Sequence, residues 1–95
     1  MKEEFLHYLW KYQLLQISVL KTTHNDVLSV ISPGIQNENT GPDFLNAKIR
    51  IAKQFWVGNV EIHLKSSDWY WHNHETDQNY DAVILHVVWE EDVEV

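Results

Sequence analysis

Four residues near the middle of the chain carry side chains that can bind metals or move protons. Asp43 follows a Gly-Pro pair, and further along the chain Glu61, His63 and Lys65 stand at every other position. Side chains two residues apart on a β-strand project from the same face, so we expect the last three to lie together. Carboxylates supply oxygen ligands to divalent cations, and an imidazole with an ordinary pKa of about 6.5 can exchange a proton at neutral pH. The group predicts either an active site or the solvated polar face of a sheet.

The segments that position these residues are two runs of alternating residues, 43–51 and 55–65, joined by a short polar turn. Such a short connection predicts an antiparallel hairpin. Because Pro42 has a fixed backbone torsion, Asp43 is expected to follow a stiff piece of chain. Gly58, inside the second run, predicts a bulge or a close backbone approach. The apolar residues that alternate with the three polar ones should face a core: Val60, Ile62 and Leu64.

The first run predicts two faces of different character. One face is apolar, and its residues are Leu45, Ala47, Ile49 and Ile51. The other face is more polar, and its residues are Phe44, Asn46, Lys48 and Arg50. Lys48 and Arg50 are therefore candidates for positive charge near a phosphate.

The flanking segments predict the remaining elements. An apolar stripe at three- and four-residue spacing predicts a helix over residues 3–16, residues 27–31 predict a strand, and residues 35–40 predict a loop. After a Ser-Ser-Asp signal for a helix N-cap, residues 69–77 are expected to form a short helix or an irregular segment. Residues 82–89 are almost continuously apolar, which is typical of a strand covered on both faces.

The expected order of elements is helix, three strands, short helix and strand, or αβββαβ. This order predicts a single α/β domain over residues 1–95, with a mixed sheet of about four strands and flanking helices. The last strand should lie parallel to a neighbouring strand, because the segment before it acts as a crossover.

The composition limits which functions are plausible. The net charge is −7, which argues against free-standing nucleic-acid binding but less against a metal-dependent nuclease, since catalytic carboxylates are themselves acidic. The chain has no cysteine, which excludes disulfides and thiolate metal sites. No apolar run approaches the ~18 residues of a membrane span. The acids Glu3 and Glu4 stand where a signal peptide would carry only positive charge. We expect a cytoplasmic protein without membrane attachment.

The predicted order and these residues resemble the PD-(D/E)xK nuclease superfamily, the restriction-endonuclease-like proteins. Its members place an Asp at the start of the second core strand and an acid-x-Lys motif on the third. Pro42-Asp43 and Glu61 stand at the matching positions. The resemblance implies that Asp43 and Glu61 would bind Mg²⁺ or Mn²⁺, with the carbonyl of Ile62 helping. It also implies a divalent-metal-dependent phosphodiesterase that hydrolyses DNA or RNA.

The sequence departs from that motif at one position. The superfamily has Lys two residues after the acid, and this chain has His63. His63 could itself orient or activate water. Lys65, further along the same face, could fold back and stabilise charge on the phosphate. Some members of the superfamily use an acid from the first helix as well. Glu3 or Glu4 could therefore approach the metal site, although neither is included in the predicted site.

A narrower resemblance rests on long strings that cover nearly the whole chain. These strings are FLHYLWKYQL, GPDFLNAKIRI, WVGNVEIHLKSSDWYWHNH and YDAVILHVVW. They resemble the N-terminal part of a bacterial family catalogued as domain of unknown function 2851. The resemblance implies that this chain is the leading domain or a fragment of a longer protein, whose downstream parts could supply basic surface. The family label implies no activity.

The sequence is compatible with two other functions. The same fold could be catalytically inactive and serve as a protein interaction or dimerisation domain, which the acidic charge and His63 favour. Alternatively, Glu61 and His63 could bind Zn²⁺ or Mn²⁺ together with His72 or His74. A further histidine, His86, lies in the apolar last strand and is expected to be buried and hydrogen-bonded.

Overall fold

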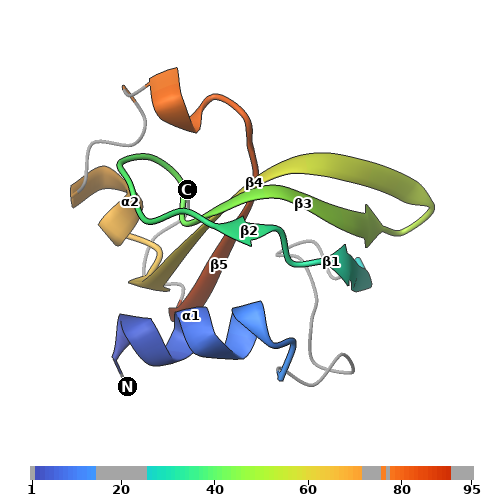
Figure 1. Ribbon diagram of the computed structural model, residues 1–95, viewed down its shortest axis with the longest axis horizontal. Helices are drawn as coiled ribbons and strands as arrows, with labels where there is room; N and C mark the ends of the chain where they lie inside the picture. The colour runs from blue at the N-terminus through green and yellow to red at the C-terminus, as the bar shows by residue number, and fades with distance from the viewer. Residues whose placement is uncertain (1, 15–25, 72–75, 77, 91–95) are drawn as a thin grey trace.

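The structure is a computed structural model that describes residues 2–14, 26–71, 76 and 78–90. The elements in chain order are α1 (Glu3–Lys11), β1 (Leu28–Ser32), β2 (Ile35–Gln36), β3 (Phe44–Ile51), β4 (Gln54–Lys65), α2 (Asp68–Trp71), η3 (Gln78–Tyr80) and β5 (Val83–Glu90). Helix α1 lies along one side of the sheet, and the far end of the β3–β4 hairpin projects beyond the other strands (Figure 1). No helix in this part of the chain is long and apolar enough to cross a membrane.

The sheet has five strands in the order β1-β3-β4-β5, with the short β2 also paired to β3. β1, β2 and β4 run antiparallel to β3, and β5 runs parallel to β4. The predicted hairpin, the parallel last strand and the α/β class with a mixed sheet are therefore confirmed. The sheet has one more strand than expected because Ile35 and Gln36, predicted as loop, pair with Leu45 and Phe44.

The core lies between α1 and the sheet. Leu6 and Trp10, one turn apart on α1, are fully buried. The Trp10 indole N–H donates a hydrogen bond to the Pro33 carbonyl oxygen at 3.0 Å, which ties the helix to the turn between β1 and β2. The strands contribute the other buried apolar residues: Leu28, Phe44, Ala47, Ile49, Val60 and Ile62.

Helix α1 ends at Lys11, earlier than predicted. Gln13 has a left-handed backbone with φ 54°. The N–H groups of Gln13 and Leu14 donate to the carbonyl oxygens of Trp10 and Leu9 at 3.1 and 2.9 Å, which is the Schellman pattern of a helix C-terminus. The prediction of a helix through residue 14 is therefore wrong, and residues 15 and 16 lie outside the described part of the chain.

A bulge in β3 changes the face on which Phe44 lies. Asn46 has φ 57°, a conformation that asparagine adopts more readily than most residues. The register of the β3–β4 pairing shifts between Phe44 and Ala47, so both side chains point into the core. The predicted place of Phe44 on the polar face of that strand is therefore wrong.

Strands β4 and β5 approach each other closely at Gly58. A Cβ at this position would lie 2.5 Å from Ile84 Cγ2 and 2.9 Å from the Ala82 carbonyl oxygen, so the predicted close approach is confirmed. Residues 83–88 of β5 are partly buried, and Ile84, Leu85 and Val87 pack against the core. Trp89 at the end of the run is 60 % exposed, so the prediction of a strand covered on both faces is wrong for Trp89.

Candidate functional site

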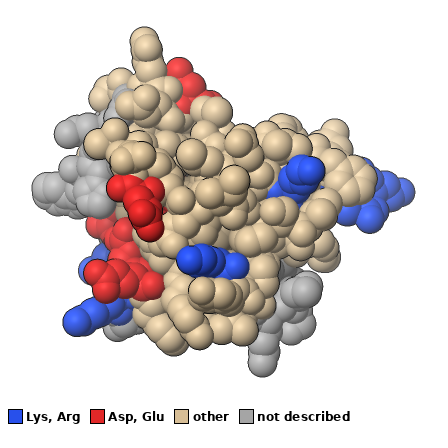
Figure 2. Space-filling view, in the orientation of Figure 1, with Lys and Arg blue, Asp and Glu red and all other residues tan. Residues whose placement is uncertain are grey.

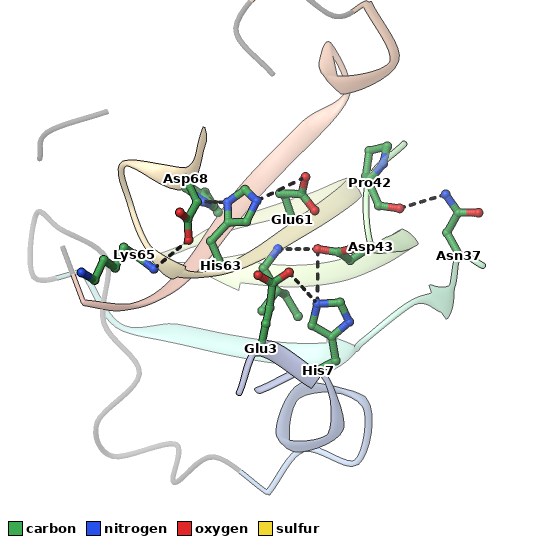
Figure 3. Close-up of polar contacts among 11 residues, drawn as sticks. Glu3, His7, Asn37, Pro42, Asp43, Glu61, His63, Lys65 and Asp68 are labelled. Carbon is green, nitrogen blue, oxygen red and sulfur yellow. Dashed lines mark hydrogen bonds and ion pairs between the residues drawn. The ribbon is translucent and has the colours of Figure 1, made fainter. Parts of the chain in front are cut away.

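The β3–β4 register brings Asp43 next to Glu61. The residue after Asp43 pairs with the residue before Glu61, and since the strands are antiparallel, the two acids stand opposite each other. Their carboxyl groups share a hydrogen bond. Asp43 Oδ2 also accepts the backbone N–H of Ile62 at 2.8 Å (Figure 3). The structure thus brings together the two acids that were expected to bind a metal.

The segment that leads to Asp43 is fixed by hydrogen bonds. Asn37 Nδ2 donates to the carbonyl oxygens of Thr40 at 3.1 Å and Pro42 at 2.9 Å, and the Asn37 backbone N–H donates to the Asp43 carbonyl oxygen at 2.8 Å. Pro42 is buried. Asp43 is therefore held by a packed and hydrogen-bonded segment, in agreement with the stiffness expected from Pro42.

The environment of Glu61 favours its neutral form. Burial, the hydrogen bond to Asp43 and the negative charge of Asp43 raise the pKa of Glu61 from 4.5 to about 9. Only 3 % of Glu61 is exposed. Two adjacent carboxylates repel each other, so one of them keeps a proton. At neutral pH the pair therefore holds a proton that a bound cation would displace.

Two residues of α1 face the same acidic pair. Glu3 and His7 are four residues apart and lie on one side of the helix. His7 Nε2 is 3.5 Å from Glu3 Oε1 and 3.6 Å from Asp43 Oδ2, and it is buried without a hydrogen bond to any described residue. The ligand atoms of Glu3, His7 and Asp43 all lie within 4.8 Å of one another. Figure 3 shows the three side chains converging from α1 and from the start of β3.

His63 lies beyond Glu61 on the same face of β4, as predicted. Its Nε2 atom is 3.9 Å from Glu61 Oε2, and its Nδ1 atom is 2.7 Å from Nε2 of His86, so one ring donates a hydrogen bond and the other accepts it. The Trp69 ring packs at 5.1 Å from the His86 ring. Only 1 % of His63 is exposed. Glu61 and His63 therefore form a covered polar pair, and the interpretation as a solvated sheet face is wrong for them.

Lys65 is the one predicted site residue that the structure places apart. It is exposed at the end of β4, and its side chain points away from Glu61 and Asp43 (Figure 3). Its backbone N–H donates to Asp68 Oδ2 at 3.3 Å. Four residues along a strand separate Lys65 from Glu61, about 13 Å, and the side chain does not fold back over that distance. His72 and His74 lie outside the described residues.

Sequence reasoning overlooked His7. The available signal was its position four residues after Glu3, which places both on one helical side, combined with the possibility that an acid of the first helix approaches the site. Which side of that helix faces Asp43 depends on the burial of Leu6 and Trp10. That burial follows from tertiary packing and not from the local pattern around His7.

Taken together, the fold and this cluster define a small mixed α/β domain with an acidic, histidine-containing site beside its central strands. The family described as "Protein of unknown function (DUF2851)" matches residues 3–95, and the chain belongs to this family. No curated protein matches the chain, and no solved structure does.

Proposed function

We propose that this protein is a divalent-metal-dependent phosphodiesterase with a restriction-endonuclease-like fold, hydrolysing DNA or RNA. The observation that carries the proposal is the convergence of Glu3 and His7 on the adjacent acids Asp43 and Glu61. The resemblance of Pro42-Asp43 and Glu61 to the two halves of a nuclease motif supports it. So does the strand pairing, which places Asp43, directly before β3, opposite Glu61 on the antiparallel strand β4.

The donor atoms of this cluster suit a divalent cation. Carboxylate oxygens are the ligands that Mg²⁺ and Mn²⁺ prefer, and an imidazole nitrogen shifts the preference toward Mn²⁺. His7 Nε2 is buried and makes no hydrogen bond within the described residues, although such groups are normally satisfied. A cation held with Glu3 and Asp43 would satisfy this nitrogen, and its charge would offset the burial and the negative charge of Asp43 that raise the pKa of Glu61.

Each residue of the cluster has a distinct part in this proposal. Glu3, His7 and Asp43 would hold the cation, and Glu61 would join them on losing its proton. When bound, the cation polarises a phosphate oxygen and lowers the pKa of an attacking water. His63 is covered and contacts Glu61, so we assign it the role of holding Glu61 in position. Lys65 has no part, because its side chain points away from the acids.

A second candidate function is a catalytically inactive domain of the same fold that binds another protein or a second copy of itself. The observation that favours it is the charge at the site. Histidine replaces the expected lysine at position 63, and the side chain of Lys65 points away. Neither position 63 nor the side chain of Lys65 therefore supplies the cation that the motif places beside the acids.

Calorimetric titration of Mn²⁺ into the purified protein separates the two functions. We expect micromolar binding to the parent, weakened at least about 100-fold in Asp43→Asn and His7→Gln, beyond what indirect changes around a metal usually cost. The matched control is Glu4→Gln, which removes an exposed acid from the same helix and should bind like the parent. Circular dichroism establishes that the variants are folded.

Cleavage of labelled oligonucleotides in Mn²⁺ completes the test. The proposal predicts cleavage by the parent and by Glu4→Gln, with loss in Asp43→Asn. A parent protein that binds no Mn²⁺ would contradict the enzyme proposal and favour the inactive domain. Binding that survives Asp43→Asn unchanged would place the cation elsewhere and contradict the assigned ligands.

A further inference from the structure

The β3–β4 hairpin differs in charge from the rest of the chain. Residues 44–60 contain three cations, Lys48, Arg50 and Lys53, and no acid, whereas the whole chain has a net charge of −7. In Figure 2, Lys and Arg side chains stand at the end of the molecule where this hairpin projects in Figure 1, and the Asp and Glu side chains in view lie elsewhere. The hairpin is thus a basic arm on an acidic domain.

One face of this arm combines the cations with exposed apolar side chains. The strand register places Lys48 opposite Val57 and Arg50 opposite Phe55, and directly opposed residues share a face of the sheet. We call these four residues the hairpin face. Phe55 is 69 % exposed and Val57 is 62 % exposed, and the Arg50 guanidinium lies 5.5 Å from the centre of the Phe55 ring.

The hairpin face lies on the side of β4 that also carries Glu61. The register shifts of this sheet insert their extra residues into β3 and β5, so β4 keeps its regular alternation. Positions 55, 57, 59 and 61 therefore project on the same side. Val57 and Glu61 are about 13 Å apart along the strand, so a chain that crosses the hairpin face is directed toward the candidate site.

We propose that the hairpin face binds single-stranded nucleic acid, with phosphates on Lys48 and Arg50 and a base stacked on Phe55. Cations that release counterions from phosphates, together with aromatic rings that stack on bases, are what proteins use for single strands. The bases of a duplex are already stacked and are not available to Phe55. The local excess of cations complements a polyanion better than it complements an average protein surface. The inference rests on the proposed function only for where the strand leads, because this binding requires no metal.

The test measures binding of a fluorescein-labelled oligothymidylate to the purified protein by anisotropy, in EDTA and over a series of KCl concentrations. The double variant Lys48→Ala/Arg50→Ala should bind at least about tenfold more weakly. Its negative slope of log K against log salt should become shallower by about 1.4, for two lost phosphate contacts on a single strand. Phe55→Ala should bind about tenfold more weakly with the slope unchanged, because stacking is not a charge interaction.

Matched controls on α1 remove the same groups elsewhere. Lys2→Ala/Lys11→Ala deletes two exposed cations, and Phe5→Ala deletes a half-exposed ring. Both variants should bind within about twofold of the parent, because none of these residues belongs to the hairpin face. Equal losses in these controls would overturn the proposal, as would absence of binding at low salt. Equally tight binding of a duplex, unaffected by Phe55→Ala, would exclude a single-strand site.

Two further outcomes separate this inference from the proposed function. Oligonucleotide binding in EDTA without cleavage in Mn²⁺ would contradict the phosphodiesterase and support the hairpin face. Self-association of the protein that Phe55→Ala abolishes, measured by light scattering, would show that a second copy covers this face and would overturn the nucleic-acid proposal.

Discussion

The two halves of β4 differ in a way that the residue types alone would not suggest. Residues 54–57 include three large apolar side chains, and all four are exposed. Residues 60–63 include an acid and a histidine, and all four are buried. Exposed apolar residues that gather together and buried polar residues are both unusual, and both point to function more often than ordinary burial does. Because β4 has exposed apolar residues in one half and buried polar residues in the other, both halves are candidates for binding.

The difference arises from what lies beside each half. The pairing of β4 with β5 begins at Asn59, so residues 54–57 pair with β3 alone among the described strands. From Asn59 onward β5 adds a second neighbour, and α1 packs over the core side. The same alternating pattern is thus left open at one end and covered at the other.

The largest difference in stability should be that between two single variants of the hairpin, in which Phe44 or Phe55 is replaced by alanine. Phe44 is fully buried in the core, so Phe44→Ala should lower the free energy of unfolding by about 3–5 kcal/mol. Phe55 is exposed, so Phe55→Ala should lower it by no more than about 1 kcal/mol, the contribution of its contact with Arg50. Urea unfolding followed by tryptophan fluorescence measures both. Similar losses in the two variants would mean that the exposed half is also packed.

The next effect concerns the covered acid. The pKa of Glu61 is raised to about 9 in the folded state, against 4.5 ordinarily. Between these pH values the folded protein binds one proton more than the unfolded chain, so stability falls as pH rises through this window. Glutamine can donate to Asp43 without this proton, and Glu61→Gln should be more stable than the parent at pH 8 by about 1–3 kcal/mol.

Urea unfolding at pH 5 and pH 8, without metal, measures this difference. The advantage of Glu61→Gln should be small at pH 5, where the folded parent keeps its proton. Glu4→Gln is the matched control at an exposed position of α1 and should follow the parent at both pH values. A parent whose stability does not fall between pH 5 and 8 relative to Glu61→Gln contradicts the assigned proton.

An effect of similar size is expected at Gly58, where the two halves meet. A methyl group would lie 2.5 Å from Ile84 Cγ2 and 2.9 Å from the Ala82 carbonyl oxygen, so β5 must move. Gly58→Ala should cost about 1–3 kcal/mol, the usual range for overpacking. Val57→Ala, next to it and exposed, serves as the control in thermal unfolding. A neutral Gly58→Ala would show that β5 gives way freely here.

The smallest effect should be the coupling between Arg50 and Phe55. Their side chains lie at 5.5 Å in a cation–π arrangement, and such exposed pairs contribute about 0.5–1 kcal/mol. A double-mutant cycle with Arg50→Ala and Phe55→Ala measures the coupling in urea unfolding. A value indistinguishable from zero would indicate that the hairpin face is not pre-arranged, although each residue could still contact a ligand.

The sequence predicted the hairpin from two alternating runs and a short connection, and the parallel last strand from the crossover segment before it. The closeness of Asp43 and Glu61 was implied by the resemblance to the nuclease motif. Prediction from the sequence failed where a backbone torsion decides the outcome. The left-handed residues Gln13 and Asn46 end the helix early and turn Phe44 into the core, and neither is a glycine that would signal it. The pairing of Ile35 and Gln36 was missed because a two-residue strand has no periodicity.

The candidate site was predicted in part for a similar reason. Residues that share one strand or one hairpin could be placed together, and Asp43, Glu61 and His63 were. His7 comes from a distant helix whose orientation depends on packing, and His86 comes from a parallel strand whose register with β4 cannot be read from alternation. Lys65 is on the same face of β4 as Glu61, but its side chain does not extend to the acids. An alternating pattern predicts which face of the strand a side chain projects from, and it does not predict how far along the strand that side chain extends.

The hydrogen bond from Trp10 to Pro33 has a consequence for how the site assembles. Glu3 and His7 lie on one side of α1. A rotation of the helix about its own axis would therefore move both side chains away from Asp43 together. Ligands on strands are aligned by pairing, but these two are aligned only while the helix is docked. A cation bound among Glu3, His7 and Asp43 would therefore bind the docked form alone, and its binding free energy would add to that of docking. Binding of the cation should therefore slow amide hydrogen exchange within α1 relative to the metal-free protein.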